Sequence, residues 1–276
     1  MPYSAEINRA TPTCFLFVVD QSGSMDERME NGGTKAQFVA DVLNKTLFQL
    51  VTNCKKAGEV RHYFDVGVIA YNDTSARTGF SGALGQDVLQ PVPLIAANPL
   101  RIEDRIKTAP DGAGGFIEQP FTFPVWFDPV SSGGTPTAEA FRMAAEVLVK
   151  WCDAHPDSYP PTVIHVTDGQ FTSDNPGPIA DAIRQISTND GTVLLFNLHV
   201  DSKSGSEVAF PATDTNLDAY GKALFAMSSY FPPTLVEEAK AQGYDVTTEC
   251  RFFGYRAGYK DISNFFKIGT KASNMR

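Results

Sequence analysis

The stretch FLFVVDQSGSM, residues 15–25, runs five apolar residues directly into an aspartate and two alternating serines. An apolar run without strict alternation is typical of a strand that is covered on both faces. Asp20 ends this predicted strand, and Ser22 and Ser24 follow it with one residue between them. Ligands of open α/β sheets collect beyond the carboxyl ends of the strands, so these oxygens stand where a binding site is expected.

Similar apolar runs recur along the chain and alternate with helical patterns. The predicted central strands are residues 14–20, 63–72, 162–168 and 192–200. Apolar residues at helical spacing predict helices over residues 34–56, 135–155 and 178–188. The alternation predicts an α/β fold with a doubly wound, Rossmann-like, mostly parallel central sheet and helices on both faces.

We expect residues 1–276 to form a single domain. Residues 1–12 would be an N-terminal arm, and residues 73–133 would hold one antiparallel edge strand and an insertion that contains an edge hairpin and surface contacts. Residues 201–276 would complete the sheet, with helices at 218–229, 233–243 and 259–269 and a strand at 249–257. The insertion returns to the chain at Thr135, so we expect its exit to lie beside the site.

Composition and charge exclude several classes of function. The formal net charge of −9 has the wrong sign for a protein that binds a nucleic-acid backbone. The N-terminus has no signal pattern and the apolar runs are too short to cross a bilayer, so we expect a cytoplasmic protein without a membrane partner. The four cysteines lack CxxC spacing, which favours buried free thiols over zinc or disulfides.

Two further oxygen-bearing residues complete the predicted site. Asp168 ends another central strand, and two carboxylates at strand ends favour a cation or a shared proton between them. Thr135 follows glycines and precedes Pro136, which is also the pattern of a helix N-cap. Each oxygen alone could be a cap or turn group, whereas the whole set favours a metal site. Hard oxygen donors without histidine or thiolate suit Mg²⁺ or Mn²⁺.

These motifs resemble the metal-ion-dependent adhesion site of von Willebrand factor A (VWA) domains. The resemblance is carried by DQSGS at 20–24, GGTPT at 133–137 and TDG at 167–169, and it covers residues 13–200. It implies the VWA fold and one Mg²⁺ or Mn²⁺ ion with an open position for a partner's glutamate or aspartate.

The resemblance also implies a role for each of the five residues. Ser22, Ser24 and Thr135 would bind the ion directly, and Asp20 and Asp168 would act largely through bound waters.

A narrower resemblance is to bacterial cytoplasmic VWA proteins associated with serine/threonine phosphatases and kinases. It rests on residues 160–172, 194–200, 225–229 and 266–273. It implies a bacterial regulatory, signalling or defence-related adaptor whose partner could belong to a phosphatase or kinase system.

Three classes of function remain to be compared. We expect a metal-dependent protein-interaction module without catalysis. The alternative is a metal-assisted phosphohydrolase with Asp20 as nucleophile, but Ser22 stands where haloacid-dehalogenase-like enzymes need an acid. A passive scaffold would leave the strand-end oxygens unexplained. We expect His165 and Trp126 to be packing residues.

Overall fold

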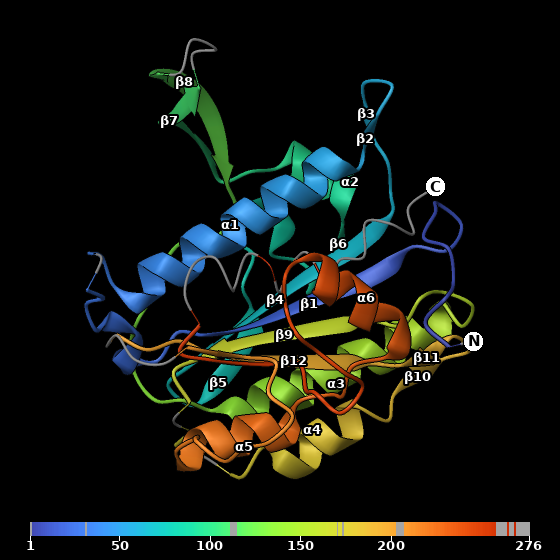
Figure 1. Cartoon of the computed structure of the whole chain (residues 1–276). Coiled ribbons are helices and arrows are strands. Elements are labelled where there is room, and N and C mark those ends of the chain that lie inside the picture. The colour runs from blue at the N-terminus through green and yellow to red at the C-terminus, as the bar shows by residue number, and fades with distance from the viewer. Residues whose placement is uncertain are drawn as a thin grey trace.

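The computed structural model describes residues 2–30, 32–110, 115–169, 171–172, 174–202 and 207–257, together with residues 264 and 268. Its centre is an eight-stranded sheet in the order β13-β14-β12-β9-β1-β4-β5, with β6 also pairing with β4 (Figure 1). The parallel strands are β1 (Thr13–Asp20), β4 (Phe64–Asn72), β9 (Thr162–Thr167), β12 (Leu194–His199) and β14 (Phe253–Tyr255). The antiparallel strands are β5 (Ser75–Thr78), β6 (Leu89–Pro91) and β13 (Val208–Ala209).

Helices cover both faces of this sheet, as the apolar runs predict. α1 (Lys35–Asn53), α2 (Val92–Ala97) and α6 (Pro233–Ala241) pack on one face, and α3 (Thr137–Ala154), α4 (Gly177–Ile183) and α5 (Ala219–Met227) on the other (Figure 1). Alternate side chains of β1 enter the two cores, with Phe17 on the α1 side and Leu16 on the α3 side. The predicted mixed α/β fold with a mostly parallel central sheet is therefore confirmed.

Several element boundaries differ from the sequence predictions. The helix expected over 178–188 ends with α4 at Ile183, and β10 (Ser187–Thr188) pairs with β11 (Gly191–Thr192) beyond it. The strand expected over 249–257 is shortened to β14. The helix expected at 259–269 lies outside the described residues, apart from the isolated residues 264 and 268.

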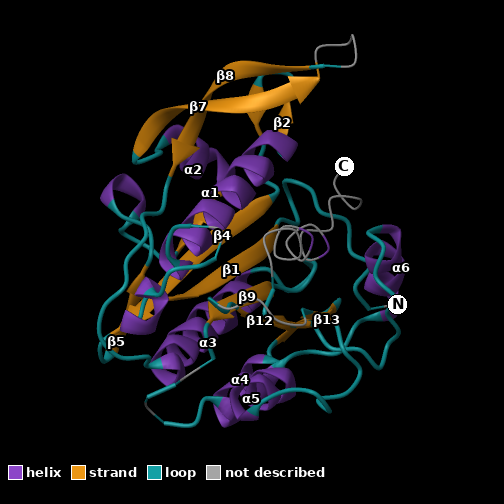
Figure 2. Ribbon diagram, turned by 60° about the vertical axis from the view of Figure 1, so that its left-hand side comes forward, coloured by secondary structure: helices purple, strands orange, loops and turns teal. Residues whose placement is uncertain are grey.

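Residues 73–133 contain more structure than one edge strand. After β5, η2 (Gly82–Leu84), β6 and α2, the chain forms a two-stranded antiparallel ribbon, β7 (Arg101–Pro110) and β8 (Phe116–Val125). The ribbon projects beyond α1 at the top of the molecule (Figures 1 and 2). A much shorter ribbon joins β2 (Lys55–Lys56) to β3 (Glu59–Val60) after α1.

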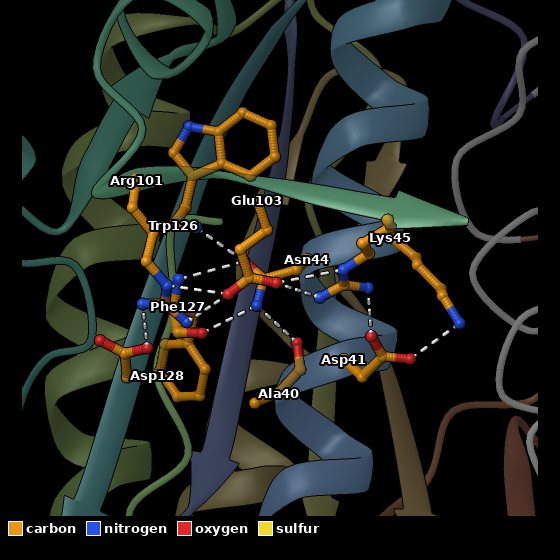
Figure 3. A network of polar contacts seen from close by, with 10 residues as sticks. Ala40, Asp41, Asn44, Lys45, Arg101, Glu103, Trp126, Phe127 and Asp128 are labelled. Carbon is orange, nitrogen blue, oxygen red and sulfur yellow. Dashed lines mark hydrogen bonds and ion pairs between the residues drawn. The ribbon is translucent and has the colours of Figure 1, made fainter. Parts of the chain in front are cut away.

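The Asn44 side chain of α1 forms hydrogen bonds with Trp126 and Phe127, which follow β8 at the base of the long ribbon (Figure 3). Its amide nitrogen donates to the Ala40 and Phe127 carbonyls at 2.8 and 2.7 Å, and its Oδ1 accepts from the Trp126 and Phe127 backbone nitrogens. Trp126 is buried, and its indole donates to the Ile95 carbonyl at 2.7 Å. The prediction that Trp126 packs the insertion down is confirmed.

The described part of the chain also bears on the cysteines and on the lengths of the helices. All four cysteines are free and buried. Among the described helices, none is both long enough and apolar enough to span a membrane.

Candidate functional site

The fold places the two predicted carboxylates at the same edge of the sheet. β1 and β9 are parallel neighbours, with Val19 opposite Val166, so Asp20 at the end of β1 and Asp168 directly after β9 leave the sheet side by side. The apolar strands themselves position these side chains, because each strand stays covered until its carboxyl end. Two neighbouring buried strands therefore place two carboxylates together at their carboxyl ends, where a ligand site is expected.

The loop after β1 folds onto the segment that leads into α3. The Gly23 nitrogen donates to the Gly133 carbonyl at 2.9 Å, which draws the two loops together. Ser22 and Ser24 lie on this loop, partly within the short helix η1 (Gly23–Asp26), and their hydroxyl oxygens are 3.1 Å apart. The serine hydroxyls are therefore held next to each other on the loop that follows Asp20.

Asp20 is buried, and both of its carboxylate oxygens accept hydrogen bonds. Oδ1 accepts from the Ser22 backbone nitrogen at 2.8 Å, and Oδ2 accepts from the Thr167 hydroxyl at 2.7 Å. Burial raises the pKa of Asp20 to about 6, the hydrogen bonds oppose the rise, and the charge of Asp168 adds a smaller upward effect. The effect of the neighbouring Asp168 carboxylate on this pKa is thus secondary to burial.

Asp168 has a cationic partner that the sequence analysis missed. Lys35, the first residue of α1, is almost fully buried, and its Nζ lies 3.3 Å from Asp168 Oδ2 and 2.8 Å from Glu27 Oε2. Burial acts to lower the pKa of Lys35, but the two carboxylates outweigh it and the pKa is raised. Nothing in the sequence around position 35 distinguishes this lysine from a solvated one at a helix start.

The other oxygen of Asp168 is unsatisfied. Oδ1 is buried and has no hydrogen-bond partner among the described residues. An unpaired buried carboxylate oxygen is costly, since it has lost water and gained nothing in exchange. This oxygen is therefore a position that a cation or a donor would satisfy.

Thr135 does not cap α3, contrary to the N-cap interpretation. The helix begins at Thr137 and its N-cap is Pro136, because the residue before a proline is driven toward extended backbone. Thr135 is instead held by Thr172, whose hydroxyl accepts from the Thr135 nitrogen at 2.8 Å and whose nitrogen donates to the Thr135 carbonyl at 3.2 Å. The Thr135 hydroxyl makes no hydrogen bond with the described residues and remains available as an oxygen donor.

Both ends of the 73–133 segment border this site. At its start, Arg77 of β5 donates to the Gln21 side chain at 2.6 Å, and at its end the Ser132 nitrogen donates to the Gln21 carbonyl at 2.8 Å. The exit of the insertion therefore lies beside the site, as its connection to Thr135 requires. The long ribbon between these ends packs by its base on α1 instead.

The two buried histidines near the sheet are structural. His165 lies inside the sheet between the Tyr71 hydroxyl at 2.7 Å and Asn197 Oδ1 at 2.8 Å, and burial lowers its pKa to about 4. His199 stacks on Tyr255 with ring centroids 4.6 Å apart, and burial lowers its pKa as well. His165 is a packing residue, as the sequence predicts.

The donor set fits a hard divalent cation. Two carboxylates and three hydroxyls offer only oxygen, and the set includes an unsatisfied carboxylate oxygen and an uncommitted threonine hydroxyl. Lys35 opposes a cation electrostatically but neutralises only part of the negative charge. In the described part of the chain, no group of three or more histidine, cysteine, aspartate or glutamate side chains is arranged to hold a metal.

Comparisons with known proteins give no family. No family model matches the chain, and no curated protein matches it. Among solved structures, the chain is similar to the pilus adhesin SpaC from Lactobacillus rhamnosus GG, with 14% identity and a TM-score of 0.48 over 98% of this chain and 31% of that one.

Further similar structures are the vWF domain of the type V pili tip protein Mfa5 from Porphyromonas gingivalis and the PilB minor pilin from Streptococcus sanguinis. They are 15% and 14% identical, with TM-scores of 0.32 and 0.31. Each matches 58% of this chain, and the matches span 39% and 30% of those chains. At these TM-scores and identities the likenesses define no family for this chain, whose fold is defined by its own sheet topology.

These findings correct the family resemblance drawn from the motifs. The assignment to VWA proteins with a metal-ion-dependent adhesion site, and to the group associated with phosphatases and kinases, is wrong as stated. No family model and no curated protein supports the assignment, and in the described part of the chain no three or more histidine, cysteine, aspartate or glutamate side chains form a group that could hold a metal. The short motifs fix local loop geometry, which unrelated chains can share, and so they do not establish ancestry.

Proposed function

We propose that this chain is a non-catalytic protein-interaction module whose recognition site is the strand-end site. Ser22, Ser24, Thr135, Asp20 and Asp168 would together hold one Mg²⁺ or Mn²⁺ ion. The observation that carries the proposal is the buried, unpartnered Oδ1 of Asp168, which follows the strand next to the one that ends in Asp20.

Hydrogen bonds within the chain fix the positions of proposed ligands without an ion. Thr167 and the Ser22 nitrogen fix the Asp20 carboxylate, and Thr172 fixes Thr135. When bound, the ion would supply a concentrated positive charge with a position open to a carboxylate, because hydroxyl ligands leave its charge largely uncompensated. A partner that presents a glutamate or aspartate side chain fits this chemistry.

The alternative, a metal-assisted phosphohydrolase, has less support from the geometry. A carboxylate nucleophile needs a free oxygen that can reach phosphorus, whereas both oxygens of Asp20 accept hydrogen bonds and the side chain is buried. Ser22 occupies the position two residues later, where such an enzyme would need a general acid. Turnover of p-nitrophenyl phosphate in Mg²⁺ that is lost in Asp20→Asn would favour the enzyme.

The cellular context is a separate matter. The regulatory or defence-related role and the link to a phosphatase or kinase rested on the family resemblance alone and lose their support with it. A cytoplasmic location stays a prediction, which fractionation of the native cell tests.

The test is a pull-down from the native cell with the chain immobilised in Mg²⁺, in Mn²⁺ and in EDTA. We expect a protein that is retained with either ion and released by EDTA, and we expect Asp168→Asn to lose both that protein and calorimetric ion binding. Asp174→Asn is the matched control, because Asp174 is an exposed carboxylate outside the site that pairs with Arg142. Retention of the same protein in EDTA would show that the ion has no part in recognition.

A further inference from the structure

The β7–β8 ribbon has no third strand among the described residues. Its ten residue pairs run without interruption from Arg101 opposite Val125 to Pro110 opposite Phe116. One face turns toward α1, where Arg105 stacks 3.8 Å over the Phe123 ring and donates to Asp41 at 2.8 Å. Beyond its base, the ribbon projects away from the body of the protein (Figures 1 and 2).

The prolines of the ribbon reveal which backbone groups point outward. In an antiparallel pair, alternate residues direct their N–H and C=O groups at the partner strand and away from it. Proline has no N–H, so in an uninterrupted ladder it occupies the outward positions. Pro110, Pro120 and Pro124 all fall in one alternating set, since the register pairs Pro120 with Ile106 and Pro124 with Ile102.

The two edges of the ribbon therefore differ. On β8, two of the five outward positions are Pro120 and Pro124, which cannot donate to an added strand. On β7, the first four residues whose backbone groups point outward are not prolines, so each of them can donate to an added strand. They are Ile102, Asp104, Ile106 and Thr108. An exposed edge with an unbroken series of donors is a template for another strand, and proline is a common way to block one.

The side chains of the same set define what would pair with β7. Ile102 and Ile106 are 57% and 67% exposed, so their apolar side chains are accessible to a strand that is added at this edge. Asp104 lies between them on the same face, is exposed, and forms no ion pair with the described residues. The edge thus carries an apolar, acidic, apolar pattern at alternate positions.

We propose that the β7 edge is a docking site for an extended peptide segment of a partner protein, which adds as a third strand to the ribbon. Its matching pattern is an apolar residue opposite Ile102, lysine or arginine opposite Asp104, and an apolar residue opposite Ile106. Directly opposed residues of adjacent strands interact, and opposite charges there are favourable. The site is distinct from the strand-end site, so binding is expected to be unchanged in EDTA.

A second copy of this chain fits the edge less well. Two β7 edges that pair symmetrically so that Ile102 meets Ile106 must place Asp104 directly opposite the other Asp104. Like charges in that position are destabilising. Charge complementarity therefore favours a basic, alternating peptide over self-association.

The probe for the test is the capped peptide Thr-Val-Thr-Lys-Thr-Val-Thr, whose symmetric sequence matches the pattern in either strand direction. Its binding to the full chain is followed by fluorescence anisotropy, beside the same peptide with Glu in place of Lys. We expect the Lys peptide to bind more tightly, and Asp104→Lys to reverse the preference. Ile106→Pro removes one outward donor and should weaken binding by about tenfold. Thr122→Pro makes the same change on the already blocked β8 edge and should leave binding within about twofold.

Amide exchange measured by NMR provides a readout that does not depend on any variant. In the free protein, the amides of Glu103 and Arg105 should be protected, and those of Asp104 and Ile106 should exchange rapidly. The Lys peptide should protect the second pair. The proposal is overturned if the peptide leaves these two amides unprotected or binds Ile106→Pro as well as wild type. It is also overturned if sedimentation shows a wild-type dimer that Ile106→Pro dissociates, since the occupant would then be a second copy.

Discussion

Replacing Asp20 with asparagine should make the ion-free protein more stable at neutral pH and less stable in acid. In the unfolded chain the carboxyl ionises near its ordinary value of 3.8, whereas in the folded chain burial raises its pKa to about 6. Between these values the unfolded chain releases the proton and the folded chain keeps it. Wild type therefore loses stability as the pH rises through this window, and the loss is complete above about pH 6.

The size of the effect follows from the two pKa values and the contacts. A rise of about two pH units, at about 1.4 kcal/mol each, means that ionised Asp20 costs about 3 kcal/mol at neutral pH. Asparagine has no charge to desolvate and can still accept from the Ser22 nitrogen. It offers the Thr167 hydroxyl no second acceptor, which costs about 1 kcal/mol. Asp20→Asn should therefore gain about 2 kcal/mol above pH 7 and lose about 1 kcal/mol near pH 4.

The assay is urea unfolding of wild type and Asp20→Asn in EDTA over this pH range. EDTA is essential, because a bound cation would favour the ionised carboxylate and mask the cost. Asp174→Asn controls for removing an exposed carboxylate and should show no such change of sign. An equal difference in unfolding free energy between Asp20→Asn and wild type at pH 4 and at pH 7.5 would refute the argument, since Asp20 would then be ionised throughout.

Three further changes test other parts of the structure. Lys35→Met should raise Mn²⁺ affinity in calorimetry by about tenfold, or about 1.4 kcal/mol, because it removes a cation that pairs with Asp168. Asn44→Ala should lower the urea unfolding free energy by about 3 kcal/mol, because three buried backbone groups lose their partner, whereas the exposed Gln49→Ala on the same helix should change it by less than about 0.5 kcal/mol. The His165 ring signals in NMR should not titrate between pH 5 and 8, and acidification from pH 6.5 toward 4 should destabilise wild type more than His165→Gln, since the unfolded histidine binds its proton first.

The sequence predicts those parts of the fold that local pattern determines. β1 is an apolar run from Cys14 to Val19, and β9 is an apolar run that His165 alone interrupts between Val163 and Val166. The carboxyl end of each strand follows from where the apolar residues stop. Once the two strands are placed as parallel neighbours, the proximity of Asp20 and Asp168 follows without further information. The helix α1 can also be predicted from the sequence, because its apolar residues recur with the period of a helix.

The edge hairpin expected between residues 73 and 133 is present, but the bounds of the ribbon could not be predicted because its sequence conflicts with the usual signs of a strand. Pro120 and Pro124 within β8 normally argue against strand pairing. They are compatible with β8 only because this strand has a free edge, and that fact belongs to the tertiary arrangement. Charged residues on β7 likewise resemble a polar loop until their α1 partners, such as Asp41 for Arg105, are known.

Lys35 illustrates a second reason why sequence reasoning fell short at the site. Whether a lysine at a helix start is solvated or buried depends on what the fold brings to it. Here the loop after β9 carries Asp168 to within 3.3 Å of the ammonium, although the two residues are 133 positions apart. Short motifs revealed the anionic half of the site, and the cationic half came from a residue with no motif.

The buried ammonium also bears on how the site can be both folded without an ion and receptive to one. Two or more close carboxylates without a counter-charge would favour unfolding, and burial would drive them to hold protons instead. Lys35 relieves this cost at Asp168 Oδ2, yet one ammonium cannot balance Asp20, Asp168 and Glu27 together once Asp20 is ionised. Above about pH 6 the group therefore keeps a negative charge, and Asp168 Oδ1 remains unsatisfied. A divalent cation would balance the remaining negative charge and would also satisfy Asp168 Oδ1. Its affinity should therefore depend on how strongly Lys35 interacts with Asp168 Oδ2.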